Sequence, residues 1–193
     1  MRGGLGLDSG ASMMRGLVFG LLCALAACLA PRQASAFERE WHVGGGAGFT
    51  AYPNYYTAGP ALGINAAYGL SDVFDLKLEL LGSTHTYRAN SMSESERGAT
   101  YSAAFGMSYK LDILQWIPYG AALLGFQHIA GPIPTNDPFR RDDALLALLV
   151  GLDYAATRNF GLGLSLRTDF LLSTIGEGEA FTTMLRAEYH WGF

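Results

Sequence analysis

The sequence has almost no cysteine, few charged residues and no long apolar run. Its two cysteines, Cys23 and Cys28, lie within residues 1–36, which we predict to be a secretory leader. After removal of the leader the chain would contain no thiol, which excludes disulfide and thiolate chemistry. The longest apolar run, residues 16–30, has 15 residues, whereas a membrane-spanning helix needs about 20. A helical membrane protein is therefore not expected.

The leader prediction rests on a basic start, an apolar core and a small-residue cleavage site. Arg15 precedes the apolar run, and residues 34–36 (Ala-Ser-Ala) stand directly before Phe37. Two alternatives remain open: an uncleaved membrane anchor, and a lipoprotein box ending at Cys28, which would leave an acylated cysteine at the new N-terminus. Translation could begin at any of three methionines, Met1, Met13 or Met14.

The predicted mature chain, residues 37–193, is acidic. The whole sequence has 13 Lys and Arg and 17 Asp and Glu, and the leader contains three of these cations and one of the anions. The mature chain thus has 10 basic and 16 acidic residues, and its formal net charge is −6. This balance argues against nucleic acid as a partner.

The mature chain contains eight segments in which apolar and polar residues alternate, and each is long enough to cross a bilayer as a tilted strand. The most hydrophobic part, residues 144–152, is bounded by aspartates and is too short for a membrane helix, so we predict a strand there as well. Short links (71–72, 112–115 and 156–159) alternate with longer ones (53–60, 86–99, 129–142 and 173–180). The predicted strands are 41–52, 61–70, 73–85, 100–111, 116–128, 143–155, 160–172 and 181–193.

Alternation alone does not decide which face of such a barrel is inside. A soluble carrier of the lipocalin type would place the apolar face within. Most glycines share parity with the polar residues, and the crowded interior of an eight-stranded barrel needs small residues. The polar face is therefore predicted to be the inner one, and the outer face should meet lipid, with aromatic girdles at both ends.

The last predicted strand shows this alternation most clearly. Leu185, Ala187, Tyr189, Trp191 and Phe193 occupy every second position. This resembles the C-terminal strand of bacterial outer-membrane β-barrels, in which a terminal aromatic is read by the barrel-assembly machinery. The resemblance implies an all-β fold, an eight-stranded antiparallel up-and-down transmembrane barrel similar to outer-membrane proteins A, X and W, covering about residues 37–193. It also implies an assembly signal at Tyr189, Trp191 and Phe193, and a location in the outer membrane.

The predicted inner face contains four cations and five anions. Because charges in a narrow lumen are costly unless they are paired, we expect a network of salt bridges that plugs the barrel. Counting from the turns places Asp75 near Lys110, and Arg167 and Asp169 near Arg186 and Glu188. A conduit whose charges select a solute is the alternative. The network residues are Asp75, Lys77, Glu79, Lys110, Asp153, Arg167, Asp169, Arg186 and Glu188.

The histidines give no clear sign of a metal or catalytic site. His42 and His190 should be inward-facing neighbours where the first and last strands meet, but no third ligand is evident, so lumen packing is expected rather than a metal. His85 is placed at the inner rim. His128 resembles the histidine of the His-x-Ser pair in lipid A deacylase barrels, yet Ala130 stands where the serine nucleophile would be, and its parity places His128 on the lipid face.

The outer loops hold the remaining functional candidates. Four arginines, Arg88, Arg97, Arg140 and Arg141, fall on the outer side, where guanidinium groups could bind lipopolysaccharide phosphates. The alternative is solvated charge balanced by Glu94, Glu96, Asp142 and Asp143. The expected function is a non-enzymatic barrel with a structural or surface-interaction role and no cofactor. Its expected partners are outer-membrane lipid, lipopolysaccharide and the assembly machinery, and the sequence leaves a transported solute and the oligomeric state open.

Overall fold

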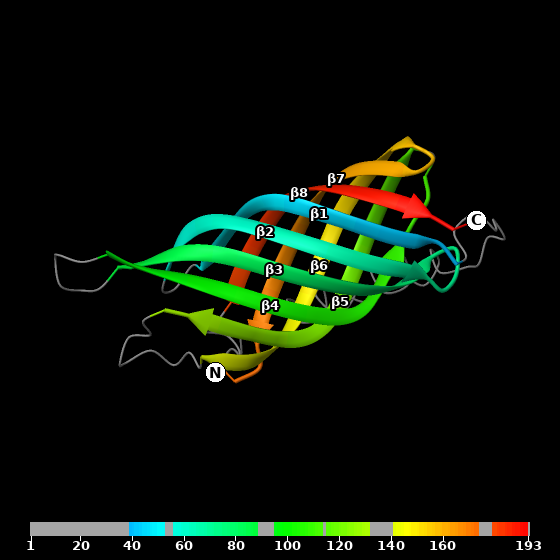
Figure 1. The fold of residues 1–193 in the computed structure, drawn as a ribbon. Coiled ribbons are helices and arrows are strands. Elements are labelled where there is room, and N and C mark those ends of the chain that lie inside the picture. Colours follow the sequence, from blue (N-terminus) through cyan, green and yellow to red (C-terminus); the bar gives the residue numbers. More distant parts are fainter. Residues whose placement is uncertain are drawn as a thin grey trace, which may run out of the picture. The chain divides into compact units, whose positions relative to one another are not determined.

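The computed structural model describes residues 39–52, 56–88, 95–113, 115–131, 141–173 and 179–192. The leader prediction, Cys28, Arg140 and Phe193 lie outside these ranges. Eight antiparallel strands form one closed barrel in sequence order (Figure 1). The strands are β1 (Trp41–Tyr52), β2 (Tyr56–Gly69), β3 (Phe74–Arg88), β4 (Ser95–Lys110), β5 (Trp116–Ala130), β6 (Asp142–Thr157), β7 (Phe160–Leu171) and β8 (Glu179–Trp191).

The barrel closes where β1 pairs with β8. The register runs from Trp41 opposite Trp191 to Ala51 opposite Phe181. Closure satisfies the backbone hydrogen bonds of both strands and leaves no free sheet edge. No helix among the described residues is long and apolar enough to span a membrane. The predicted fold class is confirmed, including β6, whose apolar sequence resembles that of a helix.

The two ends of the barrel differ, and we call them the turn end and the loop end. The turn end holds the short β2–β3, β4–β5 and β6–β7 connections, the start of β1 and the end of β8. The loop end holds the other four connections. Several strands extend further toward the loop end than predicted: β2 begins at Tyr56, and β3 and β4 pair as far as Arg88 opposite Ser95. The predicted long links 53–60 and 86–99 were therefore wrong in extent, because glycine and proline in the first and polar residues in the second do not prevent strand pairing at the barrel rim.

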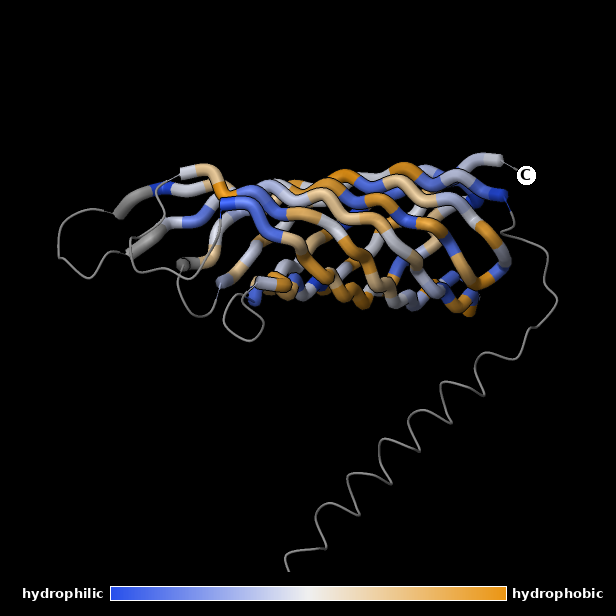
Figure 2. Tube along the Cα trace, turned by 90° about the horizontal axis from the view of Figure 1, so that it is seen from below, coloured by the Kyte–Doolittle hydropathy of each residue, from blue (hydrophilic) through white to orange (hydrophobic). Residues whose placement is uncertain are grey.

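Hydrophobic and hydrophilic residues alternate along the strands (Figure 2), and exposed positions alternate with buried ones. Leu62 and Leu185 expose 69% and 71% of their surface, whereas Lys77 and Arg167 expose only 3% and 2%. An apolar exterior around a buried ionic interior is the reverse of a soluble carrier. It is the arrangement that a lipid environment requires.

Aromatic side chains gather at the turn end, on the outer face of the barrel. They form cross-strand pairs, with ring centroids 4.9 Å apart for Trp41 and Tyr68 and 5.0 Å apart for Trp116 and Tyr154. A third pair joins Phe74 and Tyr109 at 5.3 Å. Four exposed aromatics, Phe49, Tyr101, Phe126 and Phe181, lie toward the loop end. Rings at both ends fit the two interfaces of a bilayer.

The lumen also contains an apolar cluster that the sequence pattern did not reveal. Leu123 and Leu145 are completely buried, and Leu149 and Leu171 pack in the same cluster. In β6 both faces are apolar, so the middle of the lumen side of this strand, with Leu145 and Leu149, carries no polar residue that would indicate what it packs against. The cluster fills the space between β4, β5, β6 and β7 that the charged residues leave.

Glycine makes room for bulky side chains in the lumen. A Cβ at Gly151 would collide with the ring of Tyr119, and one at Gly163 would collide with the carboxylate of Asp153. On the outer face, a Cβ at Gly120 would lie 3.7 Å from its nearest neighbour, the Leu149 carbonyl oxygen. Inward glycines are thus part of the packing.

We expect Gly151→Leu to destabilise the barrel by about 1–3 kcal/mol, because an added side chain would overpack the lumen. The measurement is the temperature at which the folded band on a semi-native gel converts to the unfolded one. Gly120→Leu is the matched control, since its side chain would point into detergent. Equal midpoints for the two variants would show that the lumen is not tightly packed.

Candidate functional site

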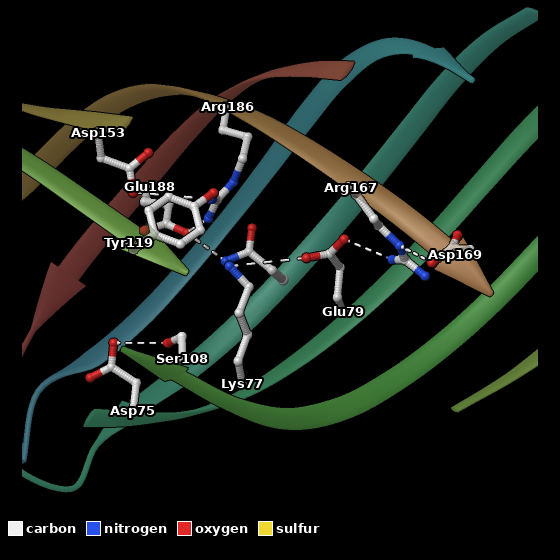
Figure 3. Close-up of polar contacts among 11 residues, drawn as sticks. Asp75, Lys77, Glu79, Ser108, Tyr119, Asp153, Arg167, Asp169, Arg186 and Glu188 are labelled. Atoms are coloured by element: carbon white, nitrogen blue, oxygen red, sulfur yellow. Dashed lines mark hydrogen bonds and ion pairs between the residues drawn. The ribbon is translucent and has the colours of Figure 1, made fainter. Parts of the chain in front are cut away.

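The lumen is the candidate site, because charged side chains from β3, β4, β6, β7 and β8 converge there; Figure 3 shows most of them. The charges divide into two groups along the barrel axis and a lysine between them. The first group centres on Arg167 of β7, and the second on Arg186 of β8. Nearer the turn end, His42, Asp75, Lys110 and His190 form a further polar layer.

Arg167 is saturated with partners. Its Nε donates to Asp169 Oδ1 at 2.7 Å, Nη1 to Glu79 Oε1 at 2.8 Å, and Nη2 to Ser102 Oγ at 3.1 Å. Because β3 and β7 are four strands apart in an eight-stranded barrel, the contact with Glu79 joins opposite walls. The guanidinium group therefore ties β7 to β3 across the lumen (Figure 3), and through Ser102 it also contacts β4.

Arg186 organises the second group. It donates to the Tyr119 hydroxyl and to Glu188 Oε1, and its Nη1 lies 3.9 Å from Asp153 Oδ2. Its guanidinium carbon also lies 5.0 Å from the centre of the Tyr119 ring. This group connects β8 with β5 and β6.

The two lysines of the lumen lie farther from their carboxylate partners than Arg167 does from Glu79 and Asp169. Lys110 Nζ lies 3.1 Å from Asp75 Oδ1, on the neighbouring strand, where the residue count from the turns places it. Lys77 Nζ lies 4.0 Å from Glu79 Oε2 and 5.0 Å from the centre of the Tyr119 ring. Lys77 thus stands between the Arg167 and Arg186 groups.

The predicted association of Arg167 and Asp169 with Arg186 and Glu188 was wrong. Counting from the turns, with predicted strands at 160–172 and 181–193, places Phe160 opposite Phe193, whereas the register places it opposite Tyr189. This stagger sets Arg186 opposite Gly163 and Arg167 opposite Thr182. Strands that tilt around a barrel are displaced along one another, and alternation does not report the displacement.

Several uncharged partners were also missed. Tyr119, Ser102 and Asn65 face the lumen and accept or donate hydrogen bonds in the two groups. Inward parity would have identified all three as lumen residues. Their partners depend on the stagger and could not be read from the sequence.

The two inward histidines at the turn end are direct neighbours. His42 and His190 face each other in the β1–β8 register, and their ring centroids are 4.3 Å apart. Beside them, burial raises the pKa of the Glu40 carboxyl above its usual value, with Lys110 acting in the opposite sense. At the other end of the lumen, His85 is buried against Tyr52, with ring centroids 5.3 Å apart.

At the loop end, the two aspartates that could have balanced the arginine charges, Asp142 and Asp143, contact other residues. Asp142 binds His128, with 2.7 Å between Oδ1 and Nδ1, and Asp143 is buried and accepts a hydrogen bond from Ser173. Both aspartates therefore have partners other than arginine. Arg97 lies on β4 rather than in a loop and is exposed, as is Arg141. Arg88 ends β3.

We expect Arg167→Ala to lower the unfolding temperature of the detergent-solubilised barrel strongly. The variant would leave Asp169 buried without its counter-ion and Glu79 with only Lys77, 4.0 Å away; removing one partner of a buried ion pair costs about 3–5 kcal/mol. Arg97→Ala is the control, because it removes an exposed guanidinium group. If the two variants unfold at the same temperature, the lumen charges do not stabilise the barrel.

Comparison with known proteins agrees with this architecture. Residues 19–191 match the outer membrane protein beta-barrel domain family. Among solved structures, OprG from Pseudomonas aeruginosa is similar with a TM-score of 0.64 and 11% identity, covering 82% of this chain and 99% of OprG. Neisserial surface protein A is similar with a TM-score of 0.58 and 18% identity, covering 77% of this chain and 96% of that protein.

Ail of Yersinia pestis, in complex with the heparin analogue sucrose octasulfate, gives a TM-score of 0.57 and 16% identity, covering 80% of this chain and 99% of Ail. No curated protein matches the chain. At these identities the solved structures support the fold alone. The family match also indicates the cellular location. The chain belongs to the outer membrane protein beta-barrel domain family, and it is a protein of the bacterial outer membrane.

Proposed function

We propose that this protein is a non-enzymatic outer-membrane barrel with a structural or surface-interaction role, and that its charged network closes the lumen. The observation that carries the proposal is the bond between Arg167 of β7 and Glu79 of β3, because it crosses the full width of the barrel. An eight-stranded barrel has room for little more than its own side chains. A pair held between opposite walls therefore obstructs any path along the axis.

The apolar cluster supports a closed lumen further. Leu123, Leu145 and Leu149 are buried and come from β5 and β6, which contribute few charges to the middle of the barrel. The Arg167 and Arg186 groups occupy the space next to them. A water-filled channel would instead need a continuous polar wall.

A lipid-modifying activity is less well supported. His128 lies on the outer face, its side chain is 48% exposed, and it binds Asp142. A histidine that is hydrogen-bonded to a carboxylate, as His128 is to Asp142, could activate a hydroxyl nucleophile. The residue two positions after His128 is Ala130, which has no hydroxyl group.

Bilayer recordings separate the closed barrel from a narrow channel. We expect the purified protein to give no discrete, reproducible openings in a planar bilayer, because opposite walls are joined by ion pairs. The variant Arg167→Ala with Arg186→Ala is expected to admit ions, since both guanidinium groups that cross the lumen are removed. Regular openings of the unmodified protein would favour the channel.

The surface role would involve the loop end, which faces outward in barrels of this class because the short turns are periplasmic. Arg97 and Arg141 are exposed there, and within the described part of the chain neither forms an ion pair. With Arg88 and Arg140 they would provide a basic surface for lipopolysaccharide phosphates. The bound sucrose octasulfate of Ail gives a precedent for a polyanion on a barrel of similar fold.

Replacing Arg97 and Arg141 together by alanine should weaken binding of lipopolysaccharide by about tenfold, because an exposed ion pair contributes about 0.2–1 kcal/mol and the loss of two such contacts approaches the roughly 1.4 kcal/mol that corresponds to a tenfold change. Binding can be measured by microscale thermophoresis with the detergent-solubilised barrel. Arg158→Ala, at the exposed β6–β7 turn of the other end, is the matched control. A similar loss in the control, or no loss in the double variant, would count against this surface.

A further inference from the structure

We propose that His42, His190 and Glu188 form a binding site for a divalent transition-metal ion of the Zn²⁺ type at the seam where the barrel closes. One ligand atom from each of the three residues lies within 4.8 Å of the other two. His42 belongs to β1, and Glu188 and His190 belong to β8. The ion would therefore join the first strand to the last.

The register of the seam brings the ligands together. His42 stands directly opposite His190, and Glu188 is two residues before His190, on the same face of β8. Both histidines are more than nine-tenths buried. Two imidazoles and one carboxylate leave a fourth position open on a tetrahedral ion, which is a donor set that Zn²⁺ accepts.

Glu188 is held in an orientation that leaves one oxygen available. Oε1 accepts hydrogen bonds from Asn65 Nδ2, at 2.6 Å, and from Arg186. The other oxygen, Oε2, lies 3.7 Å from His190 Nε2. Outer partners that fix a ligating carboxylate are a common feature of metal sites.

His190 supplies the second, independent observation. Its Nε2 is buried and has no hydrogen-bond partner among the described residues. Apart from Glu188 Oε2 at 3.7 Å, this nitrogen has no polar contact in the described part of the chain that satisfies it, and a buried polar atom left in this way is costly. A bound cation between Nε2 and the carboxylate would satisfy both. A cavity of about 40 Å³ next to it is lined by both histidines and by Asp153, and one water needs about 10–15 Å³. The cavity borders the two histidines but not Glu188, so it has room for the water molecule that would complete the coordination of the ion.

Lys110 is the competitor for this site. Its Nζ lies 3.4 Å from His42 Nε2, and an ammonium group so close to a ligand nitrogen opposes a bound cation. Asp75 offers Lys110 an alternative partner at 3.1 Å. An ion would replace the lysine at His42 and leave it on Asp75. Lys110→Met should consequently strengthen metal binding, whereas variants of the three ligands should weaken it.

The test is a titration of the tag-free, chelator-treated barrel in detergent with ZnCl₂ by isothermal titration calorimetry. We expect one saturable site. His42→Ala and His190→Ala should weaken it by about tenfold or more, and Lys110→Met should tighten it. His85→Ala is the matched control, because His85 is also buried in the lumen but lies at the loop end. Zn²⁺ should also raise the unfolding temperature of the unmodified barrel, since it links β1 to β8.

The absence of saturable binding would overturn the proposal, as would equal loss of binding in the His85 variant. A second measurement needs no variant: Co²⁺ bound at this site should show the intense visible absorption of a four-coordinate ion. If the folded, unmodified chain gives only the weak spectrum of hydrated Co²⁺, the site does not exist. Heat-modifiability on a gel identifies any variant that fails to fold.

Discussion

The pairing of β1 with β8 is the interaction on which the rest of the structure depends. In a bilayer no water can satisfy an open sheet edge, so a strand array must close on itself. Once Trp41 stands opposite Trp191, the inner face of every strand is enclosed. Charged side chains that would be exposed on an open sheet are then confined to a narrow space and must find counter-charges from other strands.

This confinement explains the division of the lumen. Near the turn end and in the middle, cations and anions alternate around the wall, and Arg167 and Arg186 each bind several acceptors. Between β4, β5, β6 and β7, where few charges point inward, Leu123, Leu145 and Leu149 fill the space. Glycines such as Gly151 leave room for the large neighbours. Charge pairing and close packing thus contribute to the same interior.

The sequence was sufficient for the fold because strand periodicity is a local property. Alternation along each segment distinguished the lipid face, including Leu62 and Leu185, from the lumen face, including Lys77 and Arg167. It was insufficient for partners, because these depend on how far each strand is displaced along its neighbour. That displacement separates Arg167 from Arg186 and joins it to Glu79 instead. The sequence also did not identify Glu188 as a neighbour of His42 and His190, although Glu188 has the same inward parity as His190.

The long-range character of the Arg167 contacts constrains how the chain can enter the membrane. Its acceptors Glu79 and Ser102 precede it by 88 and 65 residues. A half-inserted sheet that contained β7 without β3 and β4 would leave the guanidinium group with Asp169 of its own strand but without Glu79 and Ser102. Charged groups with unfilled hydrogen-bonding positions are costly in the acyl region. Stepwise insertion of single hairpins is therefore disfavoured. The strands should cross the bilayer together, late in assembly, after the polar interior has already been enclosed.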